Sequence, residues 1–419
     1  MEVSREVDIS IGELIAKADT EVGRLGLAAS TVWQYRWAWS RFEAFCLERQ
    51  VTRFCRAEAD AFLDKVVRDH RDGVIKEWKR RLFRKAVLVL REVAETGVYL
   101  WSKSDRVHPN DSLGPDLRLV REEYEAWLSG SHLADATAEL YSVVSRRALR
   151  WARGRGSGSC ADLSGKDVPA MLSDLAGSYA GSMRTAVSAL RSFCAFLDRS
   201  GRTAGLARAV PAVRGRRTKA VNVLTEADVE ALVAVPDPLK PPGRRGKAVL
   251  LLGARSGLRS VDIVALELSD IDWKAARITL VQHKTGAALT VPLLADVGDA
   301  IADYLLNERP ASADRRVFLR AKAPFTGLSP DCGFYHVASK AFKAAGVKSP
   351  EGSGRGMRVF RSALATRMLE NETPLGVISG ALGHRSPFSA KPYLAADEAR
   401  LRGCCLDFAG IEPPQGERR

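Results

Sequence analysis

Apolar residues in the first half of the chain return every three or four positions, the spacing of one face of an α-helix. Two stretches show this spacing most clearly: Trp33, Trp37, Phe42 and Phe45, then Leu190, Phe193, Phe196 and Leu197. Gly97 and Gly201 follow the last apolar turns, where a left-handed residue closes a helix. The pattern predicts two small all-α units, with breaks near Val107–Gly114 and Gly201–Pro211.

The two helical units share one residue pattern. Arg84, Ala86, Val87, Leu90 and Arg91 recur 100 positions later as Arg184, Ala186, Val187, Leu190 and Arg191. Thr31, Tyr35 and Phe45 recur 106 positions later as Thr137, Tyr141 and Trp151. Such self-similarity favours two related units over one large domain.

The pattern changes from Leu224 onwards. Thr225 precedes acidic residues and predicts the N-cap of a helix that runs to about Val233. The β-branched runs 277–282 and 288–293 flank a glycine-containing turn, which predicts a hairpin with Lys284 near its tip. Beyond the hairpin, the pattern predicts helices to about Phe408.

These elements predict a mainly α chain: two small helical units followed by a mixed α+β domain with a small antiparallel sheet. The expected boundaries are an N-terminal helical domain over 1–110, a second helical domain over 115–210, a basic linker over 211–223, a larger domain over 224–410 and a polar tail over 411–419.

Positive charge concentrates in one quarter of the chain. Lys and Arg number 64 against 50 Asp and Glu, a net charge of +14, and residues 151–250 alone carry +8. A basic connection between domains suits a polyanion, although a solvated linker explains it equally well. The candidate residues for contact with phosphates are Arg84, Arg184, Arg214, Arg216, Arg217 and Lys219.

Other features of the sequence narrow the class of protein. The seven cysteines form no CxxC pair and have no histidine at metal spacing, so neither a metal site nor a disulfide framework is indicated. The longest apolar run, Ala248 to Ala254, is too short to cross a bilayer, and no apolar signal segment opens the chain. We therefore expect a soluble cytoplasmic protein with no membrane partner.

One ordered set of motifs contains the candidate catalytic residues. Arg259 lies in Gly257–Asp262, Lys284 at the predicted hairpin tip, and Arg361 in Phe360–Leu369. His384 follows 23 residues after Arg361, and Tyr393 follows nine residues after His384. In this order and spacing, the set resembles the tyrosine recombinase (phage integrase) family. The likeness is strong over about 190 residues, while residues 119–205 resemble the family's SAM-like core-binding domain more loosely.

The resemblance implies DNA strand cleavage and rejoining through a 3′-phosphotyrosyl intermediate on Tyr393. Planar guanidinium groups at Arg259 and Arg361 would hold the phosphate. Lys284 would protonate the departing 5′ oxygen, and His384 would add a hydrogen bond and accept the tyrosine proton. The phosphotyrosyl bond itself stores the energy for rejoining, so we expect no cofactor, no metal and no small-molecule substrate.

One position departs from the family. Arg358 stands three residues before Arg361, where the family usually has a histidine. Arginine can donate to a phosphate oxygen but cannot accept a proton at neutral pH. A second lysine, Lys322, is a local rival of Lys284.

The family implies double-stranded DNA as partner and a tetramer in the synapse. The leading interpretation is a site-specific recombinase or integrase of a mobile element, with Ala395–Phe408 exchanged between neighbours or folded back on its own domain. Two alternatives stay open: a catalytically weakened DNA-binding accessory protein, or an enzyme like a type IB topoisomerase.

Overall fold

The structure is a computed structural model that describes residues 9–101, 113–179, 182–212, 223–329, 332–350 and 354–386 of the 419-residue chain. Spatial proximity divides the chain into two compact units, Lys103–Arg217 and Met1–Ser102 with Thr218–Arg419. Buried apolar side chains form separate clusters within residues 11–99, 113–210 and 224–363, and a smaller cluster within 365–382 is grouped with the third region.

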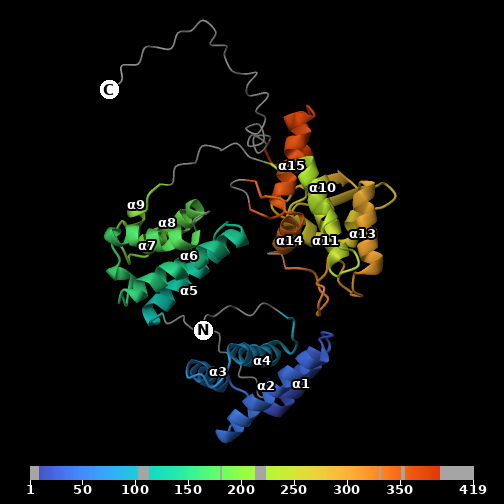
Figure 1. Ribbon diagram of the computed structural model, residues 1–419. Helices are drawn as coiled ribbons and strands as arrows, with labels where there is room; N and C mark the ends of the chain where they lie inside the picture. Colours follow the sequence, from blue (N-terminus) through green and yellow to red (C-terminus); the bar gives the residue numbers. More distant parts are fainter. Residues whose placement is uncertain are drawn as a thin grey trace, which may run out of the picture. The chain divides into compact units, whose positions relative to one another are not determined.

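Four helices make up the first region (blue in Figure 1): α1 (Ile11–Gly23), α2 (Ala29–Glu48), α3 (Arg56–Arg71) and α4 (Glu77–Thr96). Ser10 and Glu13 form a reciprocal capping box that begins α1. Trp39 is fully buried, and its indole N–H donates to the Ala86 carbonyl at 3.0 Å, which joins α2 to α4. Gly97 closes α4 in the left-handed conformation that the sequence predicts.

The second region is also helical. It contains α5 (Pro115–Ser129), α6 (Asp135–Gly154), the 3₁₀ turns η1 (Cys160–Asp162) and η2 (Gly165–Asp167), α7 (Val168–Tyr179), α8 (Met183–Arg199) and α9 (Leu206–Ala209). The α2 and α6 helices are both 20 residues long and begin 106 positions apart.

The sequence repeat corresponds to a repeat of buried positions. On α4, Ala86, Val87 and Leu90 are buried, and their counterparts on α8, 100 positions later, are buried as well. The two arginines that end this pattern have different partners. Arg91 pairs with Asp60 on α3, whereas Arg191 donates to the Val210 carbonyl at 2.6 Å.

The third region begins with the predicted helix. In α10 (Glu226–Ala234), the Thr225 hydroxyl accepts from the Asp228 N–H at 3.1 Å, and the Asp228 carboxylate accepts from Thr225 in return. Next come α11 (Gly243–Leu251), a single π-helical segment η3 (Leu252–Ser256), α12 (Ser260–Ala265) and the 3₁₀ turn η4 (Leu268–Asp270). The capped helix was correctly predicted.

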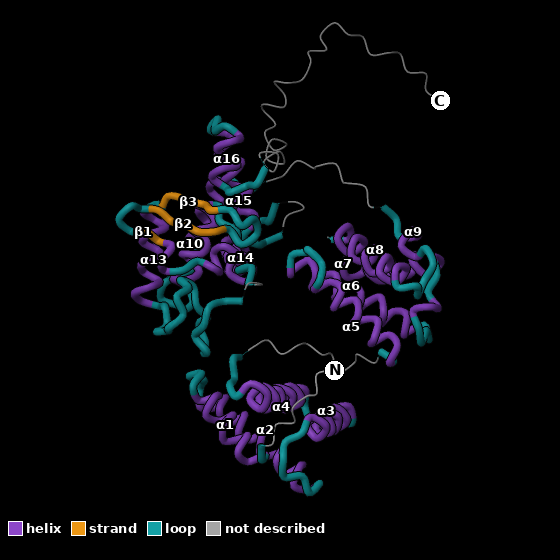
Figure 2. The backbone as a smooth tube through the Cα atoms, turned by 180° about the vertical axis from the view of Figure 1, so that it is seen from behind, coloured by secondary structure: helices purple, strands orange, loops and turns teal. Residues whose placement is uncertain are grey.

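The sheet has three antiparallel strands in the order β1 (Ile271–Asp272), β2 (Arg277–Val281) and β3 (Ala288–Pro292) (orange in Figure 2). Thr279 pairs with Thr290, and their hydroxyls lie 3.1 Å apart on the exposed face. Ile278 and Leu280 alternate with these exposed positions and are buried. The predicted hairpin is therefore confirmed, and β1 extends it by a strand that the sequence pattern did not indicate.

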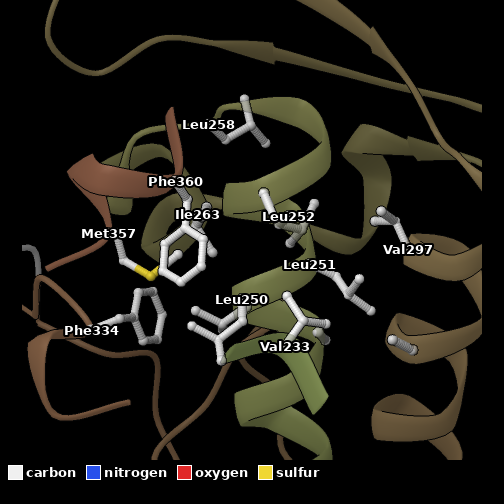
Figure 3. Packing of buried hydrophobic residues seen from close by; sticks show 14 of the residues in the cluster. Val233, Leu250, Leu251, Leu252, Leu258, Ile263, Val297, Phe334, Met357 and Phe360 are labelled. Atoms are coloured by element: carbon white, nitrogen blue, oxygen red, sulfur yellow. The ribbon is translucent and has the colours of Figure 1, made fainter. Parts of the chain in front are cut away.

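Helices α13 (Ala295–Asn307), α14 (Tyr335–Ala345), α15 (Arg358–Glu370) and α16 (Leu375–Ala381) complete the third region. Leu258 and Phe360 pack with Leu252, Ile263 and other apolar side chains in its core (Figure 3). These two buried residues directly precede Arg259 and Arg361 in the sequence, so the core fixes the backbone at both arginines.

The expectation of continuous helices after the hairpin is wrong for residues 308–334. Within its described parts, 308–329 and 332–334, this segment is irregular, and it contains the fully buried run Val317, Phe318 and Leu319. The Val317 N–H donates to Leu266 at 2.8 Å, so neighbouring chain rather than helix satisfies the buried backbone. The expected helix Ala395–Phe408 and the polar tail lie outside the described residues.

No helix in the described parts of the chain combines the length and the apolar character needed to cross a membrane.

Candidate active site

Arg259 lies at the N-cap of α12, two residues beyond a left-handed glycine. Gly257 has φ +60°, and a Cβ there would lie 2.7 Å from a Leu382 methyl carbon, so both backbone conformation and space favour glycine. The Arg259 side chain is 19% exposed, and its Nη1 is 3.8 Å from Oδ2 of the buried Asp262. Neither of these two buried atoms forms a hydrogen bond within the described residues.

Lys284 is an exposed residue in the turn between β2 and β3, as predicted. The Gln282 carbonyl accepts from the Gly286 N–H at 2.8 Å, which closes the turn around Lys284. The His283 N–H donates to Asp262 Oδ1 at 2.9 Å and so ties this turn to α12.

Arg358 and Arg361 are one turn apart at the start of α15, so they lie on one side of the helix. Arg361 is only 7% exposed. Its Nη1 donates to the Gly257 carbonyl and its Nη2 to the Leu382 carbonyl, each at 2.7 Å. These two bonds fix the plane of the guanidinium and join the segments that carry Arg259 and His384.

His384 follows α16 through a Schellman turn. The His384 N–H donates to the Ser379 carbonyl at 2.8 Å, and the N–H of Gly383, which has φ +59°, donates to Gly380 at 2.9 Å. Burial and the positive charges of Arg361 and Arg259 lower the pKa of His384 to about 4. The imidazole is therefore uncharged at neutral pH.

Five residues singled out in the sequence line one pocket of about 560 Å³: Arg259, Lys284, Arg358, Arg361 and His384. Arg385, which the sequence analysis did not select, lines it too. Among the described residues of its lining, five are cationic and none is acidic. Such a pocket suits a phosphate group, because fixed positive charge stabilises anionic oxygens in a partly dry site.

Other predicted residues are placed elsewhere or not described. Lys322 is exposed and is not part of this pocket's lining. Tyr393 lies outside the described residues, as do four basic positions of the predicted linker, Arg214, Arg216, Arg217 and Lys219.

The two candidate DNA-binding arginines of the helical regions belong to equivalent helices. Arg84 is half-buried on α4, and Arg184 is exposed near the start of α8. Arg184 and Arg191 both line a groove of about 390 Å³ along α8.

Arg385 shows where the sequence reasoning was incomplete. Its position directly after His384 was a usable signal, because a residue adjoining the end of a Schellman turn shares the surroundings of that turn. The motif alone drew attention to the histidine and not to the cation beside it.

The fold is mainly helical with a small antiparallel sheet beside a cation-lined pocket, and comparisons with known proteins identify its family. The family model described as "Phage integrase family" matches residues 222–400. A protein of Sinorhizobium fredii named as an integrase/recombinase, y4rA, is 38% identical over 290 residues, covering 67% of this chain and 69% of that protein. Tyrosine recombinase XerD of Ralstonia nicotianae is 30% identical over 185 residues, covering 43% of this chain and 58% of XerD.

A solved structure shares the fold. A lambda integrase tetramer bound to a Holliday junction matches with a TM-score of 0.51 and 19% identity, covering 81% of this chain and 90% of that one. The chain belongs to the phage integrase family of tyrosine recombinases, a family of enzymes that cleave and rejoin DNA.

Proposed function

We propose that this chain is a site-specific recombinase that cuts and rejoins DNA strands through Tyr393, as an integrase of a mobile element. The observation that carries the proposal is the pocket. Four segments far apart in the sequence bring together Arg259, Lys284, Arg361 and a neutral His384, with Arg358 beside them.

The proposed reaction divides the work among these residues. The Tyr393 oxygen attacks phosphorus, forming a bond to the 3′ phosphate and breaking the bond to the 5′ oxygen. Arg259 and Arg361 stabilise the charge that grows on the non-bridging oxygens. The tyrosine proton passes to His384, and Lys284 gives a proton to the departing 5′ oxygen.

Rejoining reverses each step. A 5′ hydroxyl attacks the phosphotyrosyl bond, Lys284 takes up its proton, and Tyr393 leaves with the proton held by His384. The three protein groups return to their starting states, so the cycle consumes no cofactor. Arg358 donates to a phosphate oxygen in place of the family's histidine, a task for which its charge is suited.

Double-stranded DNA is the proposed partner. The basic candidates Arg84, Arg184, Arg214, Arg216, Arg217 and Lys219 would contact its phosphates, in keeping with the concentration of charge in 151–250. We assign DNA recognition to helical domains 1–110 and 115–210, the connection between domains to the basic linker 211–223, and chemistry to 224–410. By analogy with the lambda integrase tetramer, four copies would assemble on DNA in the cytoplasm.

A nicked suicide duplex taken from the DNA that flanks the gene tests this function. Loss of the short cleaved end prevents rejoining, so an active enzyme accumulates as a covalent complex that survives denaturation. Failure to form this complex, with DNA still bound, would indicate a DNA-binding accessory protein. Relaxation of supercoiled plasmid that carries a single site, by the isolated monomer, would instead indicate an enzyme like a type IB topoisomerase.

A further inference from the structure

Gln282 occupies a buried position that the alternation of β2 would normally give to an aliphatic residue. Ile278 and Leu280 point to the core, and Gln282 is next in the same two-residue alternation, with 0% of its surface exposed. Burying an amide without hydrogen bonds costs free energy, so the partners of this side chain explain why it is tolerated.

All four polar groups of Gln282 have partners. Its backbone N–H donates to Ala287 at 2.9 Å, and its carbonyl accepts from Gly286 at 2.8 Å. Its side-chain Oε1 accepts from the Thr285 hydroxyl at 2.8 Å, and its Nε2 donates to the Leu382 carbonyl at 3.3 Å. The first three bonds hold the turn that contains Lys284, and the fourth reaches a different segment.

The Leu382 carbonyl is a junction between three parts of the pocket. Leu382 is the C-cap residue of α16. Its carbonyl accepts hydrogen bonds from Arg361 Nη2 at 2.7 Å and from Gln282 Nε2 at 3.3 Å. His384 follows two residues later in the Schellman turn. A shift of Gln282 would therefore displace the segments that carry Lys284, His384 and Arg361.

Close packing reinforces this junction. A Cβ built on Gly383 would lie 2.5 Å from the Gln282 amide atoms, so the glycine backbone rests directly against the amide. The two segments are 100 residues apart in the sequence, and they meet here with no room for a side chain.

We infer that Gln282 is a positioning residue that holds the Lys284 turn, through Thr285, in register with the segment of Arg361 and His384. It lines no part of the pocket and acts only through its neighbours. The inference rests on the proposed function, specifically on Lys284 as the proton donor to the 5′ oxygen.

If the Gln282 contacts are lost, we expect Lys284 to protonate the departing 5′ oxygen less well. A leaving group that needs no proton should then restore the rate of cleavage. A duplex with sulfur at the bridging 5′ position releases a thiolate, and a thiol with a pKa near about 8.5 leaves without being protonated. Single-turnover cleavage of this duplex and of the ordinary one therefore separates misplacement of the acid from general damage.

Thr285→Val removes the hydroxyl that binds Gln282 and keeps the side-chain shape. We expect it to slow cleavage of the ordinary duplex about 10- to 100-fold, as loss of a hydrogen-bond partner that orients a metal ligand does, and to cleave the sulfur duplex near the parent rate. Thr285→Ser retains a hydroxyl and should recover most of the lost rate. Gln282→Met should lose more and be only partly repaired, because the bond to Leu382 is lost as well.

The Lys284→Ala variant separates a test of Lys284 as the acid from a test of Gln282 as a positioning residue. If sulfur does not restore its cleavage, Lys284 is not the acid, and both the proposed role and this inference are wrong. If sulfur restores Lys284→Ala but leaves Thr285→Val equally slow on both duplexes, the function stands and the positioning role is wrong. Parent rates for Thr285→Val and Gln282→Met on the ordinary duplex would also overturn the inference.

Discussion

His384 is expected to remain uncharged down to mildly acidic pH. Its imidazole is half-buried, and Arg361 and Arg259 place positive charge nearby. Both effects disfavour a second positive charge and lower the pKa from 6.5 to about 4. At pH 7 the charged fraction is then on the order of 0.1%, because the pH lies three units above the pKa.

The sign of the effect on stability follows from the same shift. The unfolded chain takes up a proton at His384 near pH 6.5, whereas the folded chain resists it until about pH 4. This site's contribution to the free energy of unfolding is fully present above about pH 6.5. It is lost progressively as the pH falls from there to about 4.

Histidine-labelled protein followed by NMR gives the titration directly, because the chain has only six histidines and His384→Gln assigns the signal. We expect a midpoint near 4 that moves upward in Arg259→Gln, where one of the causal charges is gone. Arg358→Gln is the control, since it removes a pocket cation that does not contribute to the shift. A parent midpoint of 6 or above would refute the electrostatic reasoning, because Arg361, Arg259 and burial would then leave the pKa close to its ordinary value.

Three further outcomes are expected. Arg358→Ala should slow single-turnover cleavage by roughly 10²–10³-fold, as deletion of one oxyanion contact does, while Arg358→His still cleaves; an unaffected alanine variant would remove this residue from the site. Gly383→Ala should lower stability in denaturant unfolding by more than Gly346→Ala, because both have positive φ but only the former meets a neighbouring side chain, Gln282; equal losses would contradict that packing. Arg184→Ala should make the slope of log affinity for duplex DNA against log salt shallower by about 0.9, and an unchanged slope would mean that this arginine contacts no phosphate.

The sequence predicted those helices and strands that are determined by residues close together in the chain. Thr225 with Asp228 is a capping box within four residues, and the alternation of 277–282 and 288–293 reports one buried face of a hairpin. The order and spacing of the arginine, lysine and histidine motifs indicated residues that the structure brings to one pocket. Their chemical roles stay predictions.

Features that depend on distant contacts could not be predicted in this way. The buried run at Val317 has no helical or alternating period, and its backbone is satisfied by Leu266 from another segment. Gln282 ends the predicted strand 277–282 as a polar residue, yet it is fully buried, and its side-chain amide donates to the Leu382 carbonyl, 100 positions away. No local pattern encodes such a pairing.

Peptide mapping of the covalent complex on a nicked suicide duplex tests the central claim most directly. The account predicts DNA attached to Tyr393, and no complex with Tyr393→Phe although that variant binds the duplex with nearly the parent affinity, because one hydroxyl is lost and no cation is removed. Undiminished complex formation by Tyr393→Phe, or attachment of the DNA to another residue, would contradict the account.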